Sequence, residues 1–412
     1  MRKNNKKTIS IFMIILFLGL VITGCVDNKP NTLTQAQKIE DFEYMYKIIK
    51  ENYSFLEVNK RVNGIDWLSE KEDFLEEIKN TKDDDEFFYE LSYILDRLNN
   101  GHTHMLDQSS YENLISVYSE SKWHKAWYEE MSKPEALKRY VYKPKDNNQK
   151  ADVENMSLSD DNENEKFIIK DNIETKIIDD KVGYLRIKSF YYFNEEVDKG
   201  TIKDFIYDIK GLDGLIIDIR GNGGGTSSFW ARNIIPLLIE KELRTDFYNF
   251  SRGIGFTYKF FKNNRFQIEG FENLKKMKHL PPEVFIDFKY YTKDVATIEP
   301  RESINFKGKV FLLVDEGVYS AAEMFAVYAK ETGFATLIGE TTGGDGITKD
   351  PAVCTLPNSG FVFRFSYIMG TTQSGVCNEE MKTIPHYSYD AEITEDIEED
   401  KCIQKAIELM KK

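Results

Sequence analysis

Cysteine and histidine are scarce in this chain of 412 residues, and positive charge is outnumbered by negative charge. Lysine and arginine number 55 against 69 aspartates and glutamates, and the net charge of -14 argues against a general nucleic-acid binder. Four cysteines are too few for a disulfide framework, so we expect no structural disulfide. Only five histidines occur, and no further ligands stand near His102 and His104 at a useful spacing. The sequence therefore predicts no metal site, and no cofactor is expected.

The apolar run near the N-terminus is too short for an ordinary membrane span. It covers Ile9–Ile22, 14 residues against the roughly 20 that a spanning helix needs, and it follows four positive charges. The run ends in Ile22-Thr23-Gly24-Cys25, which looks like a bacterial lipobox, where small residues precede a lipid-accepting cysteine. We predict a lipoprotein signal peptide over 1–25, a lipid on Cys25 and a tether over 26–33. The protein would then be anchored to the bacterial cell membrane outside the cytoplasm. The alternative is an uncut signal anchor in which Cys25 is incidental.

The composition is that of a folded protein, since hydrophobic residues make up 41% of the chain and aromatic residues 13%. Apolar residues recur at spacings of three and four up to Leu98, which predicts an N-terminal helical domain over 34–108. Residues 109–172 are interpreted as a variable segment. Within it, 144–166 is rich in Asp, Asn, Glu, Lys and Ser, and we expect a flexible acidic loop there.

From residue 173 onward, apolar strands alternate with helical patterns. Leu215–Ile219 and Val310–Val314 are almost continuously apolar, as strands buried on both faces are. The alternation predicts an α/β core with parallel strand pairing over 173–412. Residues 242–305 are aromatic and basic, and we interpret them as an insertion in this core.

A run of glycines is the first of three features that could carry chemistry. Gly221-Asn222-Gly223-Gly224-Gly225 stands between a buried strand and a helix, where backbone N–H groups can hold an anion or an oxyanion. Thr226 stands where a dinucleotide fingerprint needs a glycine, and the lysine of a phosphate-binding P-loop is missing. The structural alternative is a tight turn without a ligand.

Ser320 and His102 are the other two features. Ser320 opens a helix after a buried strand, where the helix dipole and the N–H of Ala321 would stabilise negative charge beside its hydroxyl. Ser320 with Glu323 also forms a capping-box pattern, which is the structural alternative. His102 lies on an expected loop, and a histidine can serve as the base for a serine nucleophile. The alternative for His102 is a surface histidine or a hydrogen-bonded core one.

Taken together, these features resemble the S41 peptidases, the family of C-terminal-processing and tricorn-core proteases. Asp218–Gly225 matches the family pattern Asp-x-Arg-x-Asn-x-Gly-Gly, and Val310–Glu323 matches an apolar strand followed by Ser-Ala-Ala/Ser-Glu. Further matches are Gly183–Ile187 with Phe190, Ile338–Gly344, Pro385 and the acidic tail 390–410. The resemblance covers about 180–405, and the segment around His102 resembles the N-terminal part of the same proteins.

The resemblance implies a crotonase/ClpP-like ββα core and serine peptidase chemistry. Ser320 would be the nucleophile, and the N–H groups of Ala321 and of either Gly223 or Gly224 would form the oxyanion hole. These proteins work without a cofactor, and their partner is a peptide or protein substrate.

The family divides over the base that activates the serine. Processing proteases use a lysine 25 residues after the serine, and this chain has Asp345 there. Tricorn-like members use a histidine, matched by His102, which is oriented by a glutamate six residues before a proline. That glutamate is Glu379 here. The serine that precedes the histidine in the tricorn pattern is replaced by Gly101.

We therefore expect a membrane-tethered serine endopeptidase acting on extracytoplasmic peptides or unfolded proteins. The alternative is a catalytically inactive binding lipoprotein of the same fold, which the missing lysine favours and the pairing of His102 with Glu379 disfavours. A third interpretation, an acyl-CoA enzyme of the crotonase type, is disfavoured by the serine motif. The sequence does not indicate an oligomeric state.

Overall fold

The fold is that of a computed structural model, which describes residues 32–141, 168–253, 255–262, 271, 274, 277–394 and 396–412. The predicted signal peptide, Cys25, most of the tether and the acidic loop 144–166 lie outside these residues. Everything below concerns the compact unit Leu33–Lys412. Within its described ranges, no helix is both long and apolar enough to cross a membrane.

A six-stranded sheet forms the centre of the C-terminal half, in the order β12-β8-β7-β4-β3-β2. Its strands are β2 (Ile173–Ile178), β3 (Val182–Ile187), β4 (Gly214–Asp218), β7 (Lys309–Val314), β8 (Thr336–Gly339) and β12 (Tyr387–Ser388). All neighbouring strands run parallel except the hairpin β2–β3. The predicted α/β class is therefore confirmed.

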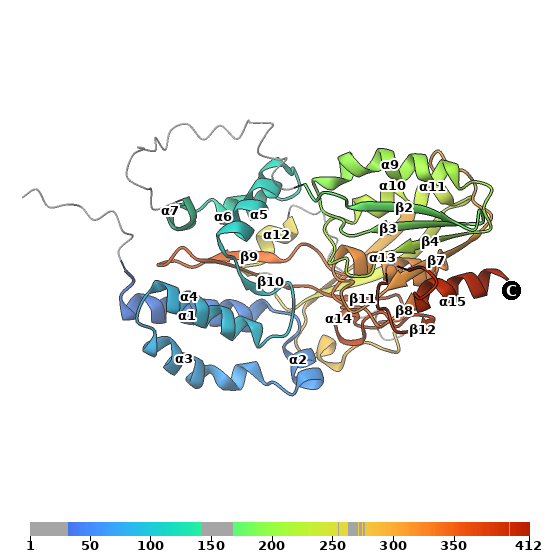
Figure 1. The fold of residues 1–412 in the computed structure, drawn as a ribbon. Helices are drawn as coiled ribbons and strands as arrows, with labels where there is room; N and C mark the ends of the chain where they lie inside the picture. The colour runs from blue at the N-terminus through green and yellow to red at the C-terminus, as the bar shows by residue number, and fades with distance from the viewer. Residues whose placement is uncertain are drawn as a thin grey trace, which may run out of the picture. The chain divides into compact units, whose positions relative to one another are not determined.

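Helices cover both faces of this sheet, because the parallel strands are apolar on both sides. Ile217 points toward α9 (Asn194–Asp208), α10 (Ser228–Asn233), α11 (Ile235–Leu238) and α13 (Ala321–Thr332), with which it shares a hydrophobic cluster. Its neighbour Ile216 points to the opposite face, where it packs with α15 (Lys401–Met410). Figure 1 shows α9 to α11 above the sheet and α15 at its right-hand end.

The N-terminal half is helical, as predicted. It contains α1 (Gln35–Asn52), α2 (Leu56–Asn63), η1 (Trp67–Glu70), α3 (Lys71–Asn80) and α4 (Asp84–Asp96). Thr34 caps α1 through a capping box with Gln37. Residues 109–141, part of the segment 109–172 that was predicted as variable, hold α6 (Lys125–Met131), α7 (Pro134–Val141) and most of α5 (Gln108–Glu120).

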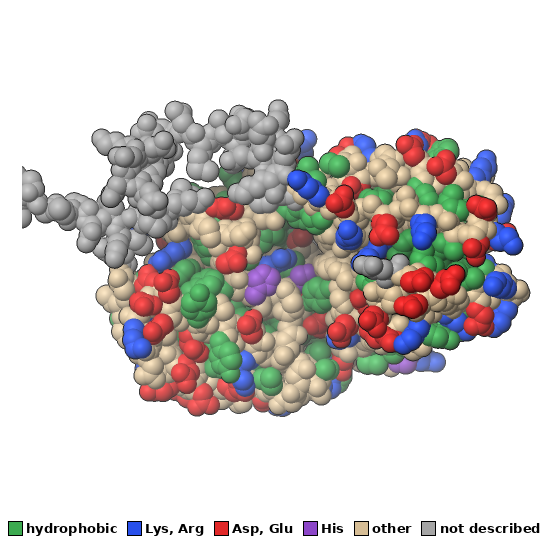
Figure 2. Space-filling model, in the orientation of Figure 1, with side chains coloured by type: hydrophobic (Ala, Val, Ile, Leu, Met, Phe, Trp, Pro, Cys, Tyr) green, Lys and Arg blue, Asp and Glu red, His purple; other side chains and the backbone are tan. Residues whose placement is uncertain are grey.

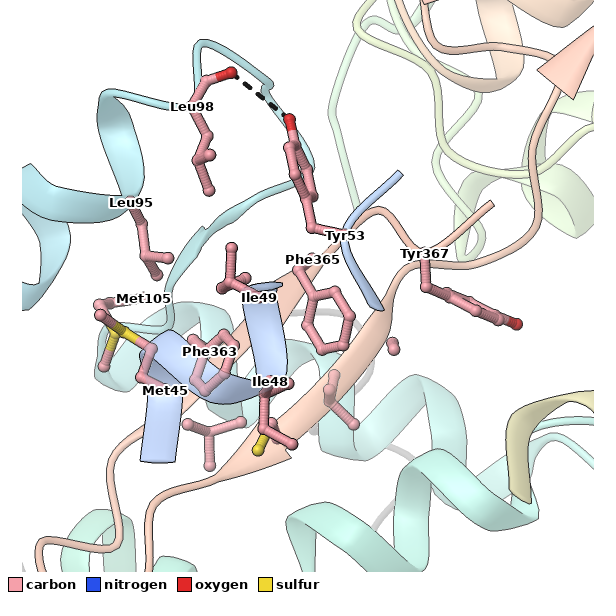
Figure 3. Close-up of a cluster of buried hydrophobic side chains, with 14 of the residues drawn as sticks. Met45, Ile48, Ile49, Tyr53, Leu95, Leu98, Met105, Phe363, Phe365 and Tyr367 are labelled. Carbon is pink, nitrogen blue, oxygen red and sulfur yellow. Dashed lines mark hydrogen bonds between the residues drawn. The ribbon is translucent and has the colours of Figure 1, made fainter. Parts of the chain in front are cut away.

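Two strands from late in the chain complete the core of this helical half. β9 (Ala352–Thr355) and β10 (Val362–Phe365) pair with β1 (His104–Met105) in an antiparallel sheet, order β1-β10-β9. In Figure 1 these strands lie among the N-terminal helices. Figure 3 shows Phe363 and Phe365 of β10 packed against Met45 and Ile49 of α1 and Leu95 of α4. The segment 34–108 therefore shares its hydrophobic core with residues far along the chain.

The segment 242–305, predicted as an insertion, forms a sheet. β5 (Leu243–Ser251) and β6 (Tyr290–Ile298) make a long antiparallel pair, and β11 (Met369–Thr371) joins the other side of β5. α12 (Tyr258–Lys262) and η4 (Pro282–Phe285) lie between β5 and β6, and α14 (Asn378–Met381) follows β11.

The shared core predicts that a change in β10 destabilises the helical half as well. Phe363 is fully buried among residues of α1 and α4, so Phe363→Ala should lower the free energy of unfolding by about 3–5 kcal/mol. Val197→Ala, at a side chain that is 55% exposed, is the control and should change it by no more than about 0.5 kcal/mol. Urea unfolding followed by far-UV circular dichroism and by tryptophan fluorescence measures both. Two separate transitions, of which Phe363→Ala shifts only one, would contradict the shared core.

Candidate active site

Ser320 occupies a strained turn between β7 and α13. Its backbone has φ 56° and ψ -121°, a conformation that costs free energy for any residue other than glycine and that clusters at functional sites. Its hydroxyl makes no capping hydrogen bond to the helix, so the capping-box alternative is not what the structure contains. Glu323 instead accepts hydrogen bonds from Asn378 Nδ2 at 2.6 Å and Thr383 Oγ1 at 2.5 Å. The Ser320 hydroxyl is left available at a half-buried position.

The glycine run after β4 lies directly against this turn. Gly224 has φ 102°, and a Cβ atom there would come within 2.7 Å of Tyr319 O and 2.8 Å of Ala321 N. The Tyr319 N–H donates to Asn222 O at 3.2 Å, which holds the two loops together. Glycine is therefore required at 224 by the close approach of the Ser320 backbone.

Asp218 and Arg220 fix the start of the same loop. The buried Arg220 guanidinium contacts Asp218 Oδ2 at 2.6 Å and Asp400 Oδ2 of the α15 N-cap at 2.7 Å. A buried ion pair needs several hydrogen bonds to offset its desolvation, and Tyr184 adds one to Asp218 at 2.8 Å. Asp218 and Arg220 therefore have a structural role, since they anchor the glycine loop to the C-terminal helix α15.

Two backbone N–H groups beside Ser320 have no acceptor among the residues that the structure describes, those of Ala321 and Gly223. The Gly224 N–H, the other one predicted for an oxyanion hole, donates to Asn222 Oδ1 at 2.9 Å. Of the two glycines, Gly223 is thus the one whose N–H is free to bind a ligand.

His102 contacts Asp345, whereas the predicted partner was Glu379. The distance from His102 Nδ1 to Asp345 Oδ2 is 2.8 Å, and the imidazole packs on the Tyr319 ring with centroids 4.8 Å apart. Glu379 Oε1 accepts a hydrogen bond from Asn100 Nδ2 at 2.9 Å instead. The predicted pairing of His102 with Glu379 is therefore wrong in this structure, because the Asp345 carboxylate already occupies that position.

The backbone brings Asp345 next to the serine turn. Ser320 N–H donates to Gly344 O at 3.4 Å, and Tyr319 forms a bridge with Gly344. Asp345 is the next residue, in the loop that follows strand β8. The structure therefore gathers the serine, the histidine and an acid from three distant parts of the sequence. In Figure 2, histidine side chains lie at the surface between the helical half on the left and the six-stranded sheet on the right.

The pKa values of Asp345 and Glu379 are shifted in opposite directions. Burial acts to raise the pKa of Asp345, but the hydrogen bond and charge of His102 outweigh it, and the pKa of Asp345 is lowered. Burial and the negative charge of Asp345 together raise the pKa of Glu379 well above its ordinary value. Asn100 bridges the two, since its Nδ2 also donates to Asp345 Oδ2 at 3.0 Å. Asp345 is therefore the first of the two acids to lose its proton as pH rises.

The two nearest lysines after Ser320 bind groups elsewhere. Lys330 Nζ donates to Ile384 O at 2.7 Å, and Lys349 forms an ion pair with Asp294 of β6. Across the described ranges, no group of three or more His, Cys, Asp or Glu side chains is arranged to hold a metal ion.

A cleft of about 490 Å³ opens beside the site, a size common for ligand pockets. One wall is α2 with Phe55, Val58 and Val62, and the opposite wall is the turn at 316–319. Gly101 and Glu379 also line it. The cleft adjoins the serine turn through Tyr319, but neither Ser320 nor His102 lines it.

Asp345 was not predicted as a site residue. Its position stood out in the sequence only because a lysine is absent there. The available signal was an ionisable side chain 25 residues after Ser320, directly behind the glycines at 343 and 344 that follow a buried parallel strand. Ligand-binding residues collect at the carboxyl ends of such strands.

Comparison with known proteins gives a family match over half of the chain. A model of peptidase family S41 matches residues 181–389. A candidate peptidase from Parabacteroides merdae has 21% sequence identity and a TM-score of 0.57, over 90% of this chain and 96% of that one. Mature CPAF complexed with lactacystin has 11% identity and a TM-score of 0.54, over 92% and 97%. At these identities the solved structures support the fold alone. No curated protein matches the chain in sequence.

The raised pKa of Glu379 predicts a change in stability with pH. Its pKa is raised in the fold from an ordinary 4.5, so above that pH the unfolded chain loses a proton that the folded chain keeps. Stability therefore falls as pH rises, by at most about 1.4 kcal/mol per pH unit. Glu379→Gln has no proton to lose, and its stability relative to wild type should grow from pH 5 upward. Denaturant unfolding at a series of pH values measures this.

Glu380→Gln is the matched control for this experiment. The Glu380 carboxylate is ion-paired with Arg61 at 2.7 Å, so its loss should give no such gain. A Glu379→Gln protein that is less stable than wild type at pH 8 would show that the residue is ionised.

Proposed function

Because the chain belongs to peptidase family S41, we propose that it is a serine endopeptidase that hydrolyses peptides or unfolded proteins outside the cytoplasm. The observation that carries the proposal is the contact of His102 with Asp345 beside the strained turn of Ser320. A nucleophile, a base and an orienting acid are what peptide hydrolysis by a serine enzyme requires.

The proposed reaction begins with attack of Ser320 Oγ on the carbonyl carbon of the scissile peptide bond. His102 Nδ1 is bound to Asp345, so Nε2 is the nitrogen that accepts the serine proton. His102 then gives this proton to the leaving amine, and an acyl-enzyme remains on Ser320. Water, deprotonated by His102, attacks the ester and releases the acid product. Asp345 holds the imidazole in the required tautomer and stabilises its charged form.

The oxyanion that forms during both attacks would be bound by the N–H groups of Ala321 and Gly223. Both belong to loops that are held rigid, one by the helix start of α13 and the other by the contact of Gly224 with the Ser320 turn. The positive end of the α13 dipole adds to the stabilisation of the negative charge. Donors that are already oriented act without a reorganisation cost.

A non-catalytic binding protein of the same fold is the alternative, and the absent lysine was its support. The His102–Asp345 contact supplies a base without a lysine, which favours the enzyme. A serine-reactive fluorophosphonate probe separates the two functions, since only an activated Ser320 forms the covalent adduct.

The proposed roles predict a clear order among variants. Ser320→Ala and His102→Ala should abolish probe labelling and peptide hydrolysis. Asp345→Asn should lower kcat by about 10³–10⁴-fold, because the tautomer of His102 is no longer fixed. Glu379→Gln, at an acid that is already neutral, should cost much less. Lys349→Ala is the control for a lysine base and should keep full activity. Labelling rates and kcat, measured together with thermal stability, test the order.

Two results would contradict these roles. Loss of activity in Lys349→Ala alone would support a lysine base. A larger loss of kcat in Glu379→Gln than in Asp345→Asn would return the orienting role to Glu379.

We further propose that the protein is anchored to the outer face of the bacterial cell membrane through a lipid on Cys25. The support is the short apolar run that ends at Gly24-Cys25. Cys25→Ala should release most of the protein into the soluble fraction, or leave it as an unprocessed precursor of higher mass. Cell fractionation with immunoblotting measures both. A variant that is processed and membrane-bound like wild type would refute the lipid anchor.

A further inference from the structure

Arg364 lies on the same strand face as the groups that hold His102. It belongs to β10 and is the direct cross-strand partner of His104 on β1. Two residues further, just after β10, Ser366 Oγ donates to Asp345 Oδ2 at 2.8 Å. Residues two apart on an extended chain face the same side and are separated by about 7 Å. The Arg364 side chain therefore starts close to the His102–Asp345 contact.

The Arg364 guanidinium makes no hydrogen bond or ion pair to any residue that the structure describes. Its Nε is buried without an acceptor, and the side chain as a whole is half-buried. A buried donor without a partner costs free energy on folding. Arg220 avoids this cost through its contacts with Asp218 and Asp400.

None of the described titratable groups around Arg364 forms a hydrogen bond or ion pair with its guanidinium. His104 is neutral, because burial and then the charge of Arg364 lower its pKa to about 4. Asp350 interacts with Arg364 electrostatically, but its carboxylate is bound to His124 Nε2 at 2.6 Å. Burial raises the pKa of Tyr118, so its hydroxyl stays protonated, and this hydroxyl is also buried without a described partner.

We propose that Arg364 binds a carboxylate group of the peptide substrate beside His102, with the Tyr118 hydroxyl as a second donor. A guanidinium presents paired N–H groups that match the two oxygens of a carboxylate. The proposal rests on the proposed peptidase function, which brings a peptide to this place. An acidic side chain or the C-terminus of the substrate can supply the carboxylate. The protein therefore selects peptides with a negative charge near the bond that is cut.

Four matched versions of one synthetic peptide that the wild-type protein cleaves test this proposal. They carry Glu or Gln next to the cleavage site, and a free or amidated C-terminus. The full chain is compared with Arg364→Met, Arg364→Lys and Tyr118→Phe. Arg186→Met is the matched control, because Arg186 on β3 also has a buried Nε without a described partner but points to the α15 face of the sheet. Mass spectrometry of the products gives kcat and KM, and the fluorophosphonate probe reports on Ser320.

For wild type, KM should be at least about tenfold lower for a peptide with the recognised carboxylate than for its neutral partner, as for a hydrogen bond to a charged group. Arg364→Met should remove the difference, Arg364→Lys should keep part of it, and Tyr118→Phe should reduce it. Neutral peptides, probe labelling and Arg186→Met should stay near wild-type values. The Glu/Gln pair and the free/amidated pair show which carboxylate is recognised.

The proposal is overturned if wild type does not distinguish the charged from the neutral peptides. It is also overturned if Arg364→Met weakens all four peptides equally, which a structural role would do. If Ser320 is not labelled and no peptide is cut, the peptidase function fails. Fluorescence anisotropy with the same four versions of an unstructured peptide then decides whether Arg364 still binds the carboxylate.

Discussion

The site depends on the hydrogen bonds that the buried carboxylate of Asp345 accepts. This carboxylate accepts hydrogen bonds from His102, Asn100 and Ser366, which come from the N-terminal loop and from the end of β10. A buried charge is tolerated only when it is paired and hydrogen-bonded. The three donors satisfy Asp345, and in doing so they fasten the helical half of the molecule to the loop beside the serine turn. The same contact that orients the imidazole thus also joins the two halves.

The rest of the geometry follows from how closely two loops approach each other. Ser320 adopts a left-handed backbone conformation, and Gly224 allows the neighbouring loop to touch it without a side chain. Strain of this kind persists only where the surroundings fix it. The surroundings that fix the Ser320 turn are the parallel strands β4 and β7. Their register places both loops at the same end of the sheet. The sheet therefore supplies the rigidity that the serine turn needs.

Local patterns in the sequence were enough to find the features that depend on local structure. The buried strands around Ile216 and Leu312, the glycine loop and the serine turn each have a signature within about ten residues. The shared core could not be found in this way. The sequence around Phe363 is that of a short apolar strand, and it does not indicate which helices this strand contacts. The sheet of β5, β6 and β11 was missed for the same reason, since β11 lies more than seventy residues after β6 in the sequence.

The positions of Asp345 and Glu379 show why spacing alone did not identify the acid that contacts His102. Both side chains lie within hydrogen-bond reach of the same amide, Asn100 Nδ2, at 3.0 and 2.9 Å. Two carboxylates so close cannot both be ionised without a large cost. His102 decides which one keeps the charge, because its Nδ1 contacts Asp345 and not Glu379. The neutral Glu379 can then remain at the wall of the cleft without competing for the imidazole. An acid counted back from Pro385 is therefore near the site, as its spacing predicts, while the acid that contacts His102 is Asp345, 25 residues after Ser320.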